Sequence, residues 1–199
     1  MKKFLEKYSH SYSEPNQNIS KETFKDEYKA FSFIYDLIYQ YGGDVFNKGL
    51  FKIHTFEYIQ KWTNLITKNY FKKEIEGQEL ICFASNWQGC MYCVNSENNL
   101  ITYFDPATCD FFSADNTSIT NFFDDVLVDG EYDIIFDDYF KDVIRYLKIN
   151  KLNYDESIGH KIFLHLGGED SIENLEIINT EVLWDLQIQV SERINEIPD

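Results

Sequence analysis

The chain of 199 residues is 44% hydrophobic and 17% aromatic, which excludes a disordered protein and suffices for one large domain or two small ones. It carries 18 basic and 34 acidic residues, a formal net charge of −16 that argues against nucleic acid and anionic membranes as partners and favours basic ones. Residues 1–100 hold 12 acids and 12 bases, whereas residues 101–199 hold 22 acids and 6 bases, so the entire surplus lies in the C-terminal half.

The N-terminal half reads as helices around one short strand. Residues 9–20 are polar and predict a loop, after which Ser20 is a suitable N-cap for a helix that ends at the Gly42-Gly43 pair. Residues 50–54 predict a short strand, and residues 55–70 return to helical spacing of apolar side chains.

The middle of the chain predicts a β-meander. Four short runs rich in β-branched and aromatic residues are separated by polar, Gly, Pro or Asn turns. Asn98-Asn99 suits a tight turn, and Pro106 ends the third run. The predicted strands are residues 80–84, 90–95, 100–104 and 110–113.

Helices dominate the C-terminal part again. Residues 118–126 and 137–147 have helical spacing, residues 162–166 and 174–178 predict strands, and Thr180 is placed to cap a last helix that ends near Ile194. Helices, then a run of strands, then mostly helices predict an α+β fold with a central, mainly antiparallel sheet flanked by helices.

Cys90 and Cys93 form a C-x-x-C spacing that could signal a redox pair or half of a zinc site. They lie inside a predicted strand, where residues three apart point to opposite faces, so we expect ordinary strand residues. Cys82 and Cys109 are isolated, and the four histidines show no zinc-finger spacing. We therefore expect neither a metal nor a cofactor, and no catalytic residues.

The cysteine count and the start of the chain also bear on the compartment. The start, MKKFLEKYSHSYSEP, has no long apolar run after it, and no stretch approaches membrane-spanning length. Four cysteines do not suggest a disulfide scaffold, so we expect a cytoplasmic protein with reduced thiols. Gly167-Gly168 lacks the lysine and the spaced glycines of a phosphate-binding loop and predicts a turn.

The run FFDDVLVDGEYDIIFDDYF, residues 122–140, carries seven acids and no base. An EF-hand register from Asp125 puts Leu127 and Phe136 at ligand positions, which excludes that calcium loop. A solvated face and a docking surface for a cationic partner both remain open, because aromatic residues among acids suit either. The candidate partner-binding residues are Asp124, Asp125, Asp129, Glu131, Tyr132, Asp133, Phe136, Asp137, Asp138 and Tyr139.

Several stretches resemble a bacterial type VI secretion DNase-immunity family, whose N-terminal region is a GAD-like domain. The most specific is residues 154–190, with a Leu-Gly-Gly, an acidic pair and Glu-Asn-Leu, similar to the family's C-terminal domain. The GAD-like region is carried by YGGDVFNKGLF (41–51), FEYIQKW (56–62), FASNWQGCMYCVN (83–95) and YFDPATCDFF (103–112).

The resemblance implies a non-enzymatic immunity protein that binds and blocks a cognate toxin, with a nuclease as the best-known target. The alternative is a binding or regulatory scaffold of the same fold without a toxin. The implied division is an N-terminal extension (1–19), a GAD-like region (20–116) and an immunity-family C-terminal region (117–199), expected to form one continuous globule because no flexible linker separates them.

Overall fold

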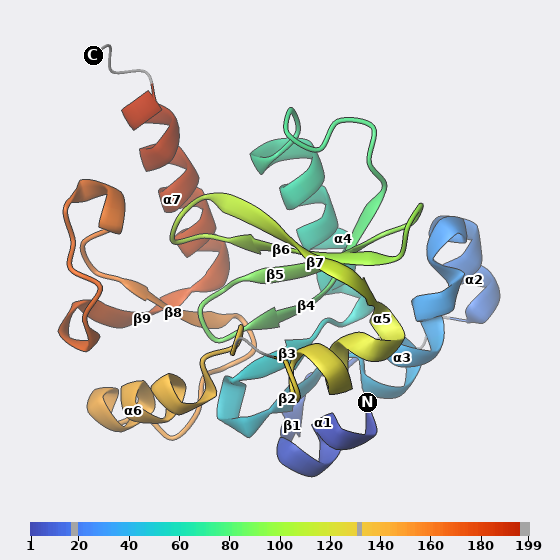
Figure 1. Cartoon of the computed structure of the whole chain (residues 1–199), viewed down its shortest axis with the longest axis horizontal. Coiled ribbons are helices and arrows are strands. Elements are labelled where there is room, and N and C mark those ends of the chain that lie inside the picture. The colour runs from blue at the N-terminus through green and yellow to red at the C-terminus, as the bar shows by residue number, and fades with distance from the viewer. Residues whose placement is uncertain (17–19, 131–132, 196–199) are drawn as a thin grey trace.

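The computed structural model describes residues 1–16, 20–130 and 133–195. A seven-stranded antiparallel sheet forms its centre, and each strand pairs with the next one along the chain (Figure 1). This confirms the predicted α+β fold with a meander sheet. The strands are β1 (His10–Ser13), β2 (Asp44–Phe46), β3 (Phe51–Ile53), β4 (Leu80–Asn86), β5 (Met91–Asn95), β6 (Leu100–Asp105) and β7 (Asp110–Ser118).

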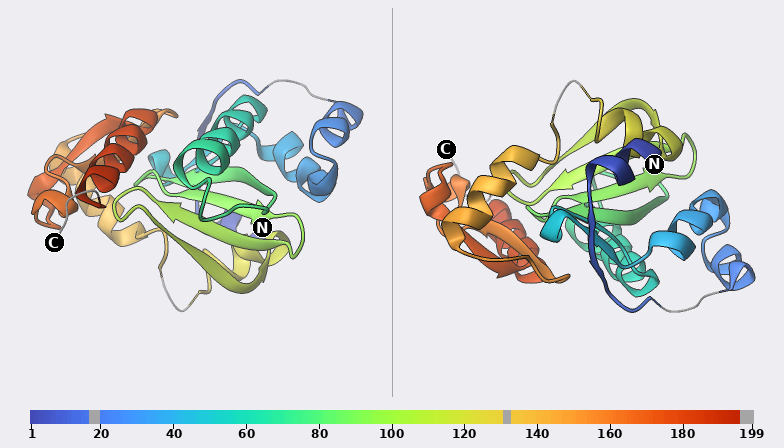
Figure 2. Two further views of the ribbon diagram at one scale, coloured as in Figure 1. Left: turned by 90° about the horizontal axis from the view of Figure 1, so that it is seen from above. Right: turned by 90° about the horizontal axis from the view of Figure 1, so that it is seen from below.

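Helices cover both faces of the sheet (Figure 2). One face is covered by α4 (Phe56–Asn64), the π-helical turn η3 (Leu65–Tyr70) and α7 (Thr180–Asn195), which pack on Met91 and Phe104. The other face is covered by α1 (Lys2–Lys7), α5 (Ile119–Asn121) and the π-helical turn η4 (Phe122–Val126). Because both faces are covered, every residue of β4 and β5 is buried.

The region predicted as one helix between Ser20 and Gly42 is broken. Ser20 caps α2 (Lys21–Glu27) as expected, since its Oγ accepts a 3.1 Å hydrogen bond from the Thr23 amide. The chain then passes through the 3-10 segment η1 (Lys29–Ile34), where Phe31 has non-helical angles, into α3 (Tyr35–Tyr41). This region packs on the start of α4, where the Phe24 and Phe56 rings have centroids 5.8 Å apart.

The first sixteen residues contribute to the fold more than their sequence indicates. The segment predicted as a loop contains β1, which pairs with β2 at the edge of the sheet. The helix α1 before it carries Phe4, which is fully buried and packs edge-on against Phe46 and Phe51. Tyr8 follows it into the core, and its hydroxyl donates to the Leu127 carbonyl at 3.2 Å.

A second, two-stranded sheet forms the C-terminal part, with β8 (Glu156–His160) paired to β9 (Leu175–Asn179). The helix α6 (Asp137–Leu147) precedes it and α7 follows it, and both agree with the predicted ranges to within a residue or two. The strand predicted at residues 162–166 is wrong, because residues Leu164–Leu166 form the 3-10 turn η5 inside the β8–β9 connection. Further short 3-10 turns are η2 (Asn47–Gly49) and η6 (Ile172–Asn174).

Candidate functional site

The first acids of the 122–140 run hold the N-terminal helix. Asp124 accepts a 3.0 Å hydrogen bond from the Phe4 amide and lies 2.8 Å from the N-terminal ammonium, while Asp129 forms an ion pair with Lys3. Desolvation would raise the pKa of Asp124, but hydrogen bonds from the ammonium and the Phe4 amide outweigh it and lower that pKa. These two acids therefore face the basic helix α1 of their own chain.

Three further acids organise the start of α6. Asp133 accepts hydrogen bonds from the amides of Ile135 (3.3 Å) and Asp137 (3.0 Å), donors that would otherwise be unsatisfied near a helix N-terminus. The Lys141 ammonium lies 3.0 Å from both Asp137 and Asp138, one turn further along the helix. The acids of this group are thus bound to α6 itself and partly neutralised there.

The remaining candidates have different surroundings. Asp125 is exposed, as is Phe136 at 49% of its surface, whereas Tyr139 is half-buried against the tryptophan of the β4–β5 turn. Glu131 and Tyr132 lie outside the described residues. The run therefore divides into a group that docks α1 and a group around the start of α6, instead of forming one uniform acidic patch.

The cysteines pair differently from their spacing in the sequence. Cys93 forms a disulfide with Cys82, its direct partner across β4 and β5, so the expectation of an isolated Cys82 and of reduced thiols is wrong. Cys90 is free, buried and 3.8 Å from Asp105, and burial followed by the nearby carboxylate raises the pKa of its thiol. Cys109 is also free. The C-x-x-C residues therefore do not act together.

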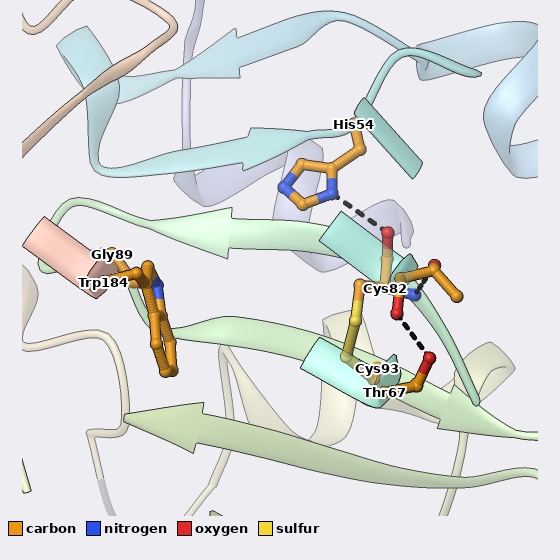
Figure 3. The surroundings of a disulfide bond; sticks show 7 residues. His54, Thr67, Cys82, Gly89, Cys93 and Trp184 are labelled. Carbon is orange, nitrogen blue, oxygen red and sulfur yellow. Dashed lines mark hydrogen bonds between the residues drawn. A yellow bond between two sulfur atoms is a disulfide. The ribbon is translucent and has the colours of Figure 1, made fainter. Parts of the chain in front are cut away.

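The disulfide lies where α4 and α7 attach to the centre of the sheet (Figure 3). The Cys82 amide donates to the Thr63 hydroxyl of α4 at 3.0 Å, and the Cys82 carbonyl lies 3.0 Å from His54 Nδ1. Trp184 of α7 donates from its indole nitrogen to the Gly89 carbonyl at 2.9 Å. These polar contacts fix both helices on an otherwise apolar face.

Two buried titratable side chains lie on or just after β3. Lys52, 1% exposed, donates to the Tyr154 carbonyl at 3.2 Å and to the Glu156 carbonyl, and burial lowers its pKa to about 7 against the weaker opposing effect of nearby carboxylates. His54 is equally buried, and desolvation lowers its pKa to about 3. Such groups can perform acid–base chemistry in an open cleft, but here solvent does not reach them. Lys52 connects β3 to residues 154 and 156 at the start of β8, whereas His54 contacts the Cys82 carbonyl of β4.

A small cavity of about 30 Å³ lies between the β4–β5 turn, β8 and α7. Gln187, 1% exposed, lines it, and neither of its amide atoms has a hydrogen-bond partner among the described residues. Tyr139, His160 and Asp170 also line it, and the His160 ring lies 3.3 Å from the Asp170 carboxylate. A volume of this size holds roughly one or two water molecules, which would satisfy the glutamine, and it is too small for an organic substrate.

Within residues 1–16, 20–130 and 133–195, no group of three or more histidine, cysteine or acidic side chains is arranged to hold a metal ion. No helix in the same part of the chain is long and apolar enough to cross a membrane.

No family model and no curated protein matches the chain. Among solved structures, it is similar to the crystal structure of Atu4351 from Agrobacterium tumefaciens, with a TM-score of 0.61 and 13% sequence identity, over 93% of this chain and 86% of that chain. At this identity the likeness shows a shared α+β fold.

Sequence reasoning missed the buried Lys52 and the disulfide partner of Cys93. A lysine inside the short run FKIH was a usable signal, because a charged residue flanked by apolar strand residues needs a partner when it is buried. The partners come from residues 154 and 156, about a hundred positions later in the chain, and no local pattern reveals them.

Proposed function

We propose that this protein is a non-enzymatic immunity protein that binds and neutralises a cognate bacterial toxin, such as a nuclease effector of type VI secretion. The resemblance of residues 154–190 to that family suggests an immunity protein. The observation that supports binding through an acidic surface is that the net charge of −16 comes entirely from residues 101–199. A nuclease holds DNA in a basic cleft, and an acidic protein surface can occupy such a cleft and exclude the nucleic acid.

The contacts within the chain narrow the residues available for this role. Asp124 and Asp129 already bind α1, so their replacement would disturb the fold as well as the surface. Asp125 is exposed and the Asp138 side chain is 98% exposed, so both can meet a partner with little effect on packing. Phe136 lies between these two acids in the sequence and is 49% exposed, so it can supply an apolar contact to the partner.

Co-expression tests this function directly. We expect the chain to restore growth to cells that express the toxin encoded by the neighbouring gene. Reversal of Asp125 and Asp138 to lysine should weaken the complex and reduce its salt dependence, because steering charges are removed. Reversal of the exposed Glu76 and Glu97 to lysine changes the net charge equally in the neutral half of the chain and is the matched control. Absence of rescue by the wild type would sink the proposal.

The compartment is a separate point. We propose that the protein acts in the cytoplasm, where a nuclease toxin meets DNA, yet the Cys82–Cys93 disulfide is of a kind that cytosolic reductants normally keep from persisting. Both cysteines are fully buried, which shields a disulfide once it has formed. Alkylation of thiols in intact cells, followed by unfolding of the protein in the reagent, distinguishes the cases. Cys82 and Cys93 that remain unalkylated because they are joined by the disulfide would favour an oxidising compartment, and alkylation of both thiols after unfolding would favour the cytoplasm.

A further inference from the structure

The connection between β8 and β9, residues 161–174, holds apolar side chains in solvent. Ile162 is 58% exposed and Leu166 is 59% exposed, the largest values for any aliphatic side chain in the described part of the chain. Figures 1 and 2 show this connection at the end of the molecule opposite α2. Large apolar side chains held in solvent close to one another in the sequence are candidates for an interaction site.

Side-chain hydrogen bonds give the connection a defined shape. Asn174 accepts from the Ile162 amide at 3.0 Å and donates to the carbonyls of Ile162 and Glu169, both at 2.8 Å. Lys161 adds a bond from its amide to the Asn174 carbonyl at 2.7 Å and one from its ammonium to the Glu173 carbonyl at 2.7 Å. One asparagine therefore closes the connection and fixes the backbone that carries Ile162.

The Gly-Gly pair makes this shape possible. Gly167 has a φ of +83°, a conformation that side-chain-bearing residues rarely adopt. A Cβ on Gly168 would lie 1.9 Å from the Ile162 carbonyl oxygen, so only glycine allows the turn to close against that residue. The turn predicted at Gly167-Gly168 is confirmed, and it follows the aliphatic residues Ile162 and Leu166.

Charge around the connection is strongly one-sided. Four acids, Glu169, Asp170, Glu173 and Glu176, are exposed, and Lys161 is the one lysine or arginine between residues 161 and 176. Four acids against one base give a net charge of −3 for these sixteen positions, with histidine neutral. The connection therefore combines exposed aliphatic side chains with exposed acids, and protein interfaces likewise combine apolar and charged side chains.

We propose that the β8–β9 connection is a docking surface for a basic protein partner that offers an apolar recess to Ile162 and Leu166. The partner class rests on the proposed function, since a nuclease toxin is basic where it holds DNA. The surface itself comes from exposure, fixed geometry and charge. It adjoins the start of α6, because Asp170 of the connection and Tyr139 of α6 line the same small cavity.

Other occupants fit the charges less well. A second copy of the chain would bring two surfaces of the same sign together, and the whole chain carries −16. An anionic membrane would repel the four exposed acids, whereas interfacial membrane segments carry lysine and arginine beside their apolar residues. A basic protein is the occupant that both the aliphatic residues and the acids favour.

Selection of short random peptides on the immobilised full chain tests the surface without knowledge of the toxin. We expect the selected peptides to combine lysine or arginine with apolar residues. Ile162→Ser with Leu166→Ser should weaken their binding by at least about tenfold, as for the central residues of an interface. The matched control is Val182→Ser with Leu186→Ser, which changes two exposed aliphatic residues (47% and 41%) on α7 and should leave binding unchanged.

A second pair of variants tests the charge. Glu169→Lys with Glu173→Lys should weaken peptide binding and flatten its dependence on salt, while the Glu76 and Glu97 reversals should not. The docking surface is overturned if no peptide is selected, if acidic peptides are selected, or if the Ile162 and Leu166 variant binds as the wild type does. Concentration-dependent self-association in ultracentrifugation that this variant abolishes would make a second copy the occupant and also overturn it.

The two proposals fail separately. If the chain does not rescue cells from the neighbouring toxin while basic peptides still require Ile162 and Leu166, the surface stands and the immunity function falls. If rescue succeeds and the Ile162 and Leu166 variant rescues equally well, the immunity function stands and the toxin binds elsewhere.

Discussion

The β4–β5 and β8–β9 pairs of this protein are both antiparallel, but they differ in how far their side chains are buried. Every residue of β4 and β5 is buried, because helices cover both faces of the central sheet. In β9, by contrast, three of the five residues are exposed, and the connection that leads to it carries the most exposed aliphatic residues described. The first hairpin stabilises the fold, and the second presents side chains to the outside.

Charge follows the same division. Residues 80–95, which form β4, its turn and β5, contain no lysine, arginine or acid, whereas residues 156–176 contain five acids and one lysine. Burial on both faces excludes charge from the first segment, since an unpaired buried charge is costly. Residues 156–176 are in contact with solvent on one side, which permits charged side chains there. Substitutions in the two hairpins should therefore separate stability from binding.

The largest effect is expected where α7 meets the β4–β5 hairpin. Trp184 is fully buried, stacks on Tyr70 with centroids 5.7 Å apart, and donates to the Gly89 carbonyl. Trp184→Ala should lower the free energy of unfolding by about 3–5 kcal/mol, because it creates a cavity and leaves that carbonyl without its donor. Urea unfolding gives the value, and Val182→Ala on the exposed side of the same helix is the control. A loss below about 1 kcal/mol would contradict this packing.

A low pH should lower the free energy of unfolding through His54, which contacts the buried strand β4. Its pKa is about 3 in the fold and about 6.5 in the unfolded chain, so only the unfolded chain takes up the proton between these values. The contribution of His54 to the free energy of unfolding is fully present above pH 6.5 and is lost as the pH falls toward 3. The loss amounts to about 3 kcal/mol at pH 4. His54→Asn, which keeps a donor for the Cys82 carbonyl, should remove that part of the pH dependence in urea unfolding at pH 7 and pH 4. An equally steep loss in the variant would assign the effect to other groups.

The disulfide should contribute somewhat less. Cys82 and Cys93 are eleven positions apart, and closing so short a loop stabilises a fold by about 2–3 kcal/mol. Cys82→Ala combined with Cys93→Ala should lower the free energy of unfolding by that amount and make it insensitive to a reductant. The wild type should lose stability when reduced, and Cys109→Ala, which removes a free thiol, should behave as the wild type. A wild type that responds to no reductant would show that the bond does not form.

Local patterns were sufficient for much of the fold. The apolar spacing of Asp137–Leu147 matches α6, and the short β-branched runs from residue 80 match β4 to β7 because their turns carry suitable residues. The pairing of Cys82 with Cys93 could not be foreseen, since an irregularity between Cys82 and Ala84 shifts the register of β4 against β5. Strand β8 was missed because Ser157 and Gly159 have weak strand preference and gain their burial from α7 and the β4–β5 turn.

In the candidate site, too, the sequence pattern did not show which residues contact one another. The run of residues 122–140 looked uniform because sequence records its charge and not its partners. Asp124 and Asp129 find theirs in Phe4 and Lys3, more than a hundred positions earlier in the chain. Asn174 likewise reaches back to Ile162 to shape the connection. Contacts between distant segments decide which acids remain available, and their geometry is a property of the whole fold.

The smallest effect on stability is expected at the exposed hairpin, although its effect on binding should be large. Ile162→Ser with Leu166→Ser should change the free energy of unfolding by no more than about 0.5 kcal/mol, because both side chains already lie mostly in water. The urea midpoint of the double variant, measured beside that of Trp184→Ala, checks the contrast. A loss of more than about 1 kcal/mol would mean that these residues pack on the fold, and the division between a stabilising and a presenting hairpin would fail. An unchanged midpoint together with lost peptide binding would show that the protein keeps two aliphatic side chains in solvent for the benefit of a partner.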